Sequence, residues 1–233
     1  MKKQFLVLVH IMTTLAMFSQ NEIAFKDLVS QSQQHYVAEK NYNIALQYSF
    51  YQSHTSEEIY ESYSGKIVNQ NQDFLFTMNT IEILASKGNL VKVSHDEKVI
   101  LVSNYNGDNQ SPTNLSIYES YFNTIHVFKK NGGYSCELSD PVMKQIPYHK
   151  IRIEFNDQYQ ITKQTIYFVS EVRYQNKLGQ EQRSVPRLEI DFKEKSNKTV
   201  AINIEDYVHL KGEKMVLSNR LKDYQLIDNR IKN

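Results

Sequence analysis

The sequence is poor in the residues that cross-link, bend or loosen a chain. Its 233 residues include 1 cysteine, 4 prolines and 7 glycines, and tryptophan is absent. One cysteine cannot form an internal disulfide, so a hydrophobic core must hold the chain together. Cys136 alternates with polar neighbours and is expected to be a small buried side chain. The lack of tryptophan argues against a carbohydrate-binding surface, where sugar rings commonly stack on that side chain.

An excess of charge is also lacking. The chain has 27 Lys and Arg against 26 Asp and Glu, and its formal net charge is +1. Nucleic-acid binding normally needs clustered Lys and Arg. We therefore expect no nucleic-acid partner.

Catalytic and metal-binding motifs are missing as well. There is no Gly-x-Ser-x-Gly elbow, phosphate loop, His-Glu-x-x-His helix or Cys-x-x-Cys pair. His95, Asp96 and Glu97 are adjacent, so their side chains point in different directions and are interpreted as a solvated turn. His149 is interpreted as a partly buried strand histidine bonded to backbone. We expect no enzyme, catalytic residue, metal or cofactor; a metal-dependent hydrolase that uses His149 or His95 remains a third hypothesis behind the two given below.

The first residues have the pattern of a signal peptide. Lys2-Lys3 is a basic start, residues 5–16 are an apolar core, and residues 17–20 are a cleavage region. We predict a signal peptide over 1–19, cleaved after Ser19, and a location in the periplasm or outside the cell. A membrane span needs about twenty apolar residues, so no transmembrane segment is expected after cleavage.

Alternation of apolar and polar residues is the main positive signal. Tyr42 to Ser103 is predicted to form an antiparallel meander of about six strands. Its first strand alternates one residue at a time, which is the period of a strand and not of a helix. Lys87-Gly88-Asn89 supplies a turn in which Gly88 can adopt a positive φ. The last strand pair, over 90–102, has apolar residues on both faces, which predicts that a helix covers its second face.

A second block of strands follows a crossover loop at 104–114. The predicted hairpins are Ile125–Leu138 and Tyr148–Val169, with a hairpin tip at Gln175–Ser184. The strand Arg187–Phe192 is predicted to bury Leu188, Ile190 and Phe192 and to expose Arg187, Glu189 and Asp191. One more strand is predicted at Val200, Ile202 and Ile204, and Tyr224, Leu226 and Ile227 are expected to dock the tail on the sheet.

Two helices are predicted. The first covers Asn21–Lys40, and its expected apolar contacts are Ile23, Leu28, Tyr36 and Val37. The second runs from Leu115 to Phe122 and is the candidate cover for the second sheet face. No internal repeat or linker occurs, so 20–233 is predicted to be a single domain.

These elements predict an α+β fold in which a large curved antiparallel sheet is covered on its concave face by helices. The helix over 21–40 is followed by strands at Tyr42–Phe50, Glu61–Val68, Asp73–Met78, Ile81–Ala85, Leu90–Val93 and Lys98–Val102. This series resembles the periplasmic lipoprotein-carrier family with the LolA/LolB-like fold. The Ser19-Gln20 ending of the signal region also resembles uncharacterised exported proteins of the Bacteroidetes type. The family resemblance implies a half-barrel whose concave apolar face holds acyl chains.

The candidate lining of that face is a set of apolar strand residues. They are Leu46, Tyr48, Phe50, Phe74, Phe76, Met78, Leu188, Ile190 and Phe192. The alternative for the same residues is a closed core beneath the helices. The first functional hypothesis is a periplasmic, non-enzymatic binding protein that carries lipid or the acyl chains of a lipoprotein. The second is a cell-envelope protein–protein interaction module without a lipid ligand, suggested by Tyr-rich loops and a near-neutral charge.

Overall fold

The structure is a computed structural model that describes residues 23–71, 73–105, 113–175, 178–193, 196, 200–212 and 214–230. The predicted signal peptide and its cleavage site lie outside the described residues. A 12-stranded sheet dominates the fold, with the strand order β16-β6-β5-β4-β3-β2-β1-β13-β10-β9-β8-β7. Its neighbouring strands are antiparallel except for the parallel pair of β16 and β6. The sheet is open, because its two end strands do not pair with each other.

The first six strands confirm the predicted meander. They are β1 (Asn41–Tyr51), β2 (Ile59–Gln70), β3 (Asp73–Met78), β4 (Ile81–Ser86), β5 (Asn89–Ser94) and β6 (Val99–Asn104). Each pairs with the next in order along the sheet. Between β4 and β5 the chain turns through Lys87 and Gly88, and Gly88 has the expected positive φ of 74°.

The second block of strands extends the same sheet beyond β1. It consists of β7 (Phe122–Lys130), β8 (Gly133–Pro141), β9 (Tyr148–Asn156), β10 (Ile161–Phe168) and β13 (Arg187–Phe192). Two small hairpins stand apart from the sheet, β11 (Val172–Gln175) with β12 (Glu181–Ser184), and β14 (Val208–Lys211) with β15 (Lys214–Leu217). The last strand is β16 (Gln225–Asp228). The helical elements are α2 (Phe25–Ala38) and the 3-10 turns η2 (Ser116–Ser120), η3 (Ile204–Asp206) and η4 (Asn219–Leu221).

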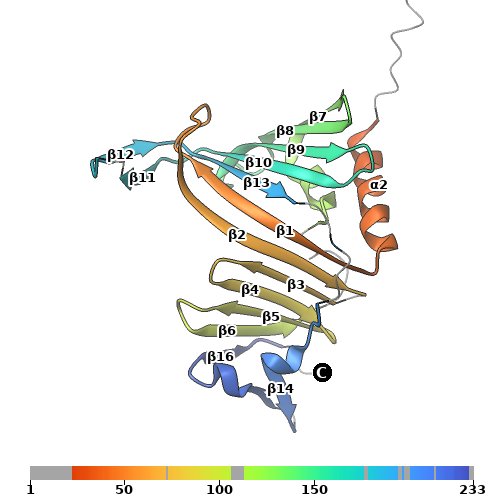
Figure 1. Cartoon of the computed structure of the whole chain (residues 1–233), viewed down its shortest axis with the longest axis vertical. Helices are drawn as coiled ribbons and strands as arrows, with labels where there is room; N and C mark the ends of the chain where they lie inside the picture. Colours follow the sequence, from red (N-terminus) through yellow and green to blue (C-terminus); the bar gives the residue numbers. More distant parts are fainter. Residues whose placement is uncertain are drawn as a thin grey trace, which may run out of the picture.

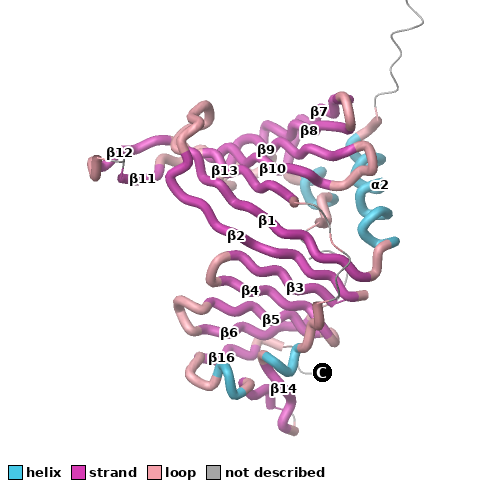
Figure 2. Tube along the Cα trace, in the orientation of Figure 1, coloured by secondary structure: helices cyan, strands magenta, loops and turns pink. Residues whose placement is uncertain are grey.

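Figures 1 and 2 show how these parts are arranged around the long, curved strands β1 and β2. The helix α2 lies beside the end of the sheet that contains β7–β10. The C-terminal segment, with β14 and β16, lies at the other end, next to β6. The helical part and the C-terminal part of the chain therefore occupy opposite ends of the sheet.

The helix α2 buries one stripe of its surface against the sheet. Its buried residues are Phe25, Leu28, Val29, Ser32 and Tyr36, which follow the three-and-four spacing of an amphipathic helix. They join a large core that includes strand residues of β1, β8, β9, β10 and β13. The face of the sheet that contributes to this core is called the α2 face below. The predicted contact of Val37 is wrong, since that side chain lies off the stripe and is 78% exposed.

The other face of β4–β6 carries a second core. Leu84, Val91, Val93, Ile100 and Val102 pack there against Ile204, Tyr207, Val208, Met215 and Leu221 of the C-terminal segment. A cover was expected for this strand pair, but the cover is the C-terminal segment and not a helix at 115–122. Tyr224 and Leu226 dock as predicted, whereas Ile227 is 37% exposed.

Two further predicted elements differ from the structure. Residues 115–122 form only the short 3-10 turn η2 before β7 begins at Phe122, although Leu115 is buried. The strand predicted at 200–204 is absent from its described residues, where irregular backbone leads into η3. Two of its alternating apolar residues pack on the second core without forming a strand: Ile204 is buried there, and Ile202 is partly buried against it. The predicted cover of the concave face by helices is not confirmed, since α2 is the one α-helix among the described residues.

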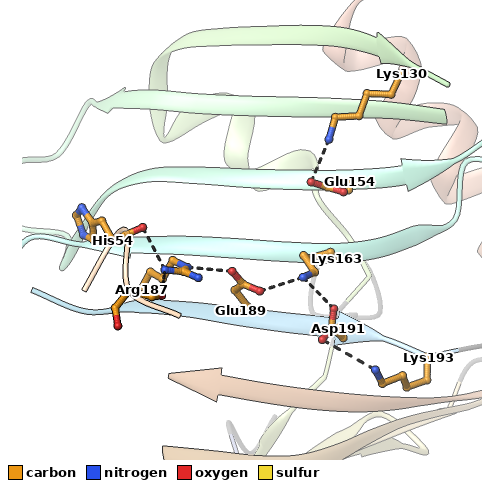
Figure 3. A network of polar contacts seen from close by, with 9 residues as sticks. His54, Lys130, Glu154, Lys163, Arg187, Glu189, Asp191 and Lys193 are labelled. Atoms are coloured by element: carbon orange, nitrogen blue, oxygen red, sulfur yellow. Dashed lines mark hydrogen bonds and ion pairs between the residues drawn. The ribbon is translucent and has the colours of Figure 1, made fainter. Parts of the chain in front are cut away.

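The face opposite α2 is polar across β7–β10 and β13 (Figure 3). Lys163 bridges Glu189 at 2.9 Å and Asp191 at 3.3 Å, and Lys130 pairs with Glu154 at 3.1 Å. The pairs of Lys163 join the adjacent strands β10 and β13, as cross-strand pairs prefer, whereas Lys130 of β7 reaches past β8 to Glu154 of β9. This face is a compensated, solvated surface.

Arg187 belongs to this charged face but is buried, with 7% exposure, which corrects its predicted exposure. Its guanidinium donates to the carbonyls of Ser53, His54 and Ser56 and to the carboxylate of Glu189. The loop between β1 and β2 folds over the side chain for this reason. The alternating pattern predicted correctly which face of β13 carries Arg187. It contains no information on the loop between β1 and β2 that covers this side chain.

A polar cluster fastens the C-terminal segment to the sheet. Glu82 of β4 accepts hydrogen bonds from Nε2 of His95 at 2.6 Å and from the hydroxyl of Tyr207. Nδ1 of His95 lies 2.8 Å from the hydroxyl of Tyr224. Burial acts to raise the pKa of Glu82, but the hydrogen bonds from Tyr207 and His95 outweigh it and hold the pKa below its usual range. The ionised carboxylate is therefore the form that the folded chain stabilises.

We predict that Glu82→Gln makes the free energy of unfolding less dependent on pH in the acid range. The depressed pKa of Glu82 means that its contribution is complete above the ordinary value of 4.5 and is lost as pH falls through the folded pKa. The wild-type advantage over the variant in free energy of unfolding, about 1–3 kcal/mol near neutral pH, should shrink between about pH 5 and about pH 3. Urea unfolding at several pH values measures it. Glu205→Gln is the matched control, because that carboxylate pairs with Lys87 at 3.6 Å in an exposed position; a constant Glu82 effect across this range contradicts the prediction.

Candidate functional site: a half-exposed apolar strip

The α2 face continues from the main core onto β3–β6, where none of the described helices packs against it. The strand register places Phe76 of β3 opposite Ile83 of β4, and Met78 opposite Ile81. On β6, Val99 and Leu101 lie on the same face. We call Phe76, Met78, Ile81, Ile83, Val99 and Leu101 the apolar strip. All six side chains are half-buried, so each offers apolar surface to whatever lies over the sheet.

The strip is bounded at both ends by further apolar side chains. Towards β1 it meets an aromatic group in which the ring of Phe50 lies 6.1 Å from Tyr63 and 6.3 Å from Phe168. Towards the sheet edge it reaches Ile227 of β16, which is the register partner of Leu101. On the same face, next to the strip along β3–β5, Phe74, Ala85 and Leu90 form a small buried cluster, and the ring of Tyr105 lies beside Phe74. The apolar surface therefore extends over β3 and β4 and resumes on β6 and β16, with Lys92 and Ser94 of β5 between the two parts.

The nine residues predicted as a lining all lie on the α2 face. Register pairs Leu46 with Phe192, Tyr48 with Ile190 and Phe50 with Leu188, and β2 connects this group to β3. Five of them are buried in cores, namely Leu46, Tyr48, Phe74, Leu188 and Ile190. The four that keep accessible surface are Phe50, Phe76, Met78 and Phe192. Contact with a ligand stays a prediction for all nine.

The sequence prediction missed the part of the site on β4–β6. Ile81 and Ile83 alternate clearly, and residues 99–102 are apolar on both faces. Those patterns showed that both faces were apolar, but not which face the C-terminal segment covers. The structure shows that the segment takes the face of Leu84, Val91 and Ile100. The face of Ile83 and Leu101 is the one left half-exposed.

Charge on this face is sparse. Among the described residues of β2–β6, Lys92 is the cation on the α2 face, exposed and with Ile83 and Leu101 as its register partners. Glu61 lies at the far end of the face, opposite Phe50. A hydrogen bond with Glu61 raises the pKa of Tyr63 to about 12, so the carboxylate is engaged there.

The other residues singled out in the sequence lie elsewhere. His149 is exposed, with its ring 5.2 Å from that of His54, and His95 is held in the Glu82 cluster. Within the described part of the chain, no group of three or more His, Cys, Asp or Glu is placed to hold a metal. Cys136 is fully buried as predicted, and burial raises its pKa to about 12.

A separate small cavity lies on the opposite face, beneath the C-terminal segment. It has a volume of about 250 Å³ and is lined by Leu75, Leu84, Ala201, Ile202, Asn203, Asp206, Tyr207 and Arg220. This volume is below the range of about 300–1,000 Å³ that is typical of ligand pockets. The apolar strip is therefore the stronger candidate site.

No family model matches the chain, and no curated protein matches it. Its structure is similar to known structures, among them the following three. A LolA superfamily protein from Nitrosomonas europaea is 10% identical, with 77% of this chain and 96% of that chain covered and a TM-score of 0.32. An uncharacterized conserved protein from Thermus thermophilus is 5% identical, with 88% and 98% covered and a TM-score of 0.46. LprF from Mycobacterium bovis is 10% identical, with 78% and 99% covered and a TM-score of 0.32.

The first of these structures belongs to the family that the sequence resembles. All three likenesses have a TM-score below 0.5, so no property of those proteins is transferred to this chain. Among the described residues, no helix has the length and apolar character needed to cross a membrane.

We predict that Ile83→Ala and Leu84→Ala have unequal effects on stability. These neighbours point to opposite faces, Leu84 fully buried and Ile83 half-buried. Leu84→Ala should lower the free energy of unfolding by about 2–5 kcal/mol, whereas Ile83→Ala should lower it by less, about 1–2 kcal/mol, because part of the removed surface already contacts solvent. Chemical denaturation of both variants measures the difference. Equal losses would show that Ile83 is covered and that the strip is not available to a ligand.

Proposed function

We propose that this protein is an exported, non-enzymatic binding protein that carries lipid or the acyl chains of a lipoprotein on the apolar strip. The observation that carries the proposal is the strip itself, six half-buried apolar side chains aligned across β3, β4 and β6 on one face. Contiguous apolar surface on a folded chain marks a place where something apolar binds. The predicted signal peptide would bring such a surface to the cell envelope, where lipids are its neighbours.

The energetics suit an acyl chain. Each buried CH₂ contributes about 0.8 kcal/mol, so a chain that covers several strip residues recovers several kcal/mol against the cost of ordering it. The aromatic group around Phe50 closes one end of the strip with large apolar surfaces. A sheet also suits this task, because its backbone groups are already paired and leave only side chains to face the ligand.

Copurified lipid tests the proposal directly. The full chain is expressed with its own export sequence, purified without detergent, and extracted with organic solvent for mass spectrometry. We expect lipid at near-stoichiometric amounts, and we expect less in Ile83→Asn/Met78→Asn, which places amides on the strip. Phe128→Asn is the matched control, since Phe128 is 52% exposed on β7, outside the strip, and its loss should leave the lipid content unchanged.

A clean extract from all three proteins contradicts the proposal. If envelope extracts instead yield a stoichiometric protein partner without lipid, the interaction-module hypothesis replaces it. Such a partner should then be lost in the double variant at the strip and retained in Phe128→Asn.

A further inference from the structure

Lys92 occupies an unusual place on the apolar strip. It lies in the middle of β5, and its register partners on both sides, Ile83 and Leu101, belong to the strip. Along its own strand the neighbours on the same face are Leu90 and Ser94. A cation is thus placed between two apolar register partners, inside a strand of six residues.

Two other mid-strand cations of this sheet, both on the opposite face, have acidic partners. Lys163 lies between Glu189 and Asp191, and Arg152 donates to Glu137 at 2.9 Å. For Lys92 the described residues provide no ion pair within 4.0 Å and no carboxylate on a neighbouring strand of the same face. Within the part of the chain that the structure describes, the ammonium therefore has no anionic partner.

We infer that Lys92 binds the anionic head of the ligand, and that the ligand is a long-chain fatty acid whose carboxylate pairs with the ammonium. This inference rests on the proposed function and names its substrate class. Four strand spacings of about 4.8 Å separate β5 from β1, roughly 19 Å across the sheet. A single extended acyl chain with its head at Lys92 can therefore run across the sheet over Ile83 and Phe76, which lie in line with Lys92 by register, towards β1.

One cation and one strip match a ligand with one charge and one chain. A diacyl phospholipid brings two chains and a substituted phosphate, for which several donors usually converge. Here Ser94 and Ser103 are the polar side chains near Lys92 on this face, and neither is charged. The four methylenes of Lys92 themselves extend the apolar surface beneath a ligand chain, so the side chain serves both parts of the fatty acid.

Binding of a matched ligand pair tests the assignment. Oleic acid and oleyl alcohol share a chain and differ in the charge of the head, and each is titrated by calorimetry at low salt against delipidated wild type, Lys92→Met and Lys66→Met. Lys66 is the matched control because its register position on β2 puts it on the opposite face. Met keeps the length and apolar stem of Lys and removes only the charge.

We expect wild type and Lys66→Met to bind oleic acid roughly fivefold more tightly than oleyl alcohol, the factor that an accessible ion pair of about 1 kcal/mol provides. In Lys92→Met this preference should vanish through weaker oleic acid binding, with oleyl alcohol unchanged. Lys92→Arg should show the same preference for oleic acid as wild type. In about 0.5 M salt the preference should disappear from wild type, because salt screens an accessible ion pair.

The outcomes separate this inference from the proposed function. If wild type binds neither of these ligands nor phosphatidylglycerol vesicles, the proposed function itself fails. If wild type binds both ligands without preference, or if Lys92→Met weakens both equally, the strip holds acyl chains but Lys92 is not a head site. If phosphatidylglycerol vesicles bind in a Lys92-dependent manner while oleic acid does not, the fatty-acid assignment is wrong. Circular dichroism of each variant confirms that the fold is intact.

Discussion

Apolar side chains on both faces of β4–β6 are the constraint on which the structure depends. A strand with Leu84 on one face and Ile83 on the other cannot satisfy both by packing against a single layer. The chain resolves half of the problem with its own C-terminal segment, which buries Leu84, Val91 and Ile100. Because α2 lies at the other end of the sheet, the second face of these strands keeps accessible apolar surface. The candidate site is the part of the sheet that the chain's own cover does not reach.

The sequence predicted most of the sheet because a period of two is a local property. The six strands of the meander, the hairpins around Gly132 and Asp157, and the strand at 187–192 are all found where alternation placed them. Local pattern also gave α2 and the positive φ of Gly88. It failed where the outcome depends on distant partners. Arg187 is buried by a loop more than 130 positions earlier, and residues 200–204 alternate without a neighbouring strand to pair with.

The same distinction applies to the site. Alternation identified which residues share a face, and all nine predicted lining residues do. It could not separate the buried Leu46 from the half-exposed Met78, because exposure depends on where α2 and the C-terminal segment come to rest. The alternating pattern also did not single out Lys92, because a lysine in a strand is expected to face solvent unless its register partners are known. The significance of Lys92 arises from Ile83 and Leu101, nine residues away on either side.

The parallel pairing of β16 with β6 has a consequence for the order of synthesis. Strand β6 ends at Asn104, but the strand that completes its outer edge lies at Gln225–Asp228, close to the end of the chain. Until the last residues emerge, β6 presents an unpaired and apolar edge that can recruit strands from other molecules. A chain that is still being synthesised therefore needs protection of that edge until β16 is available. Deletion of β16 would turn a transient hazard into a permanent one.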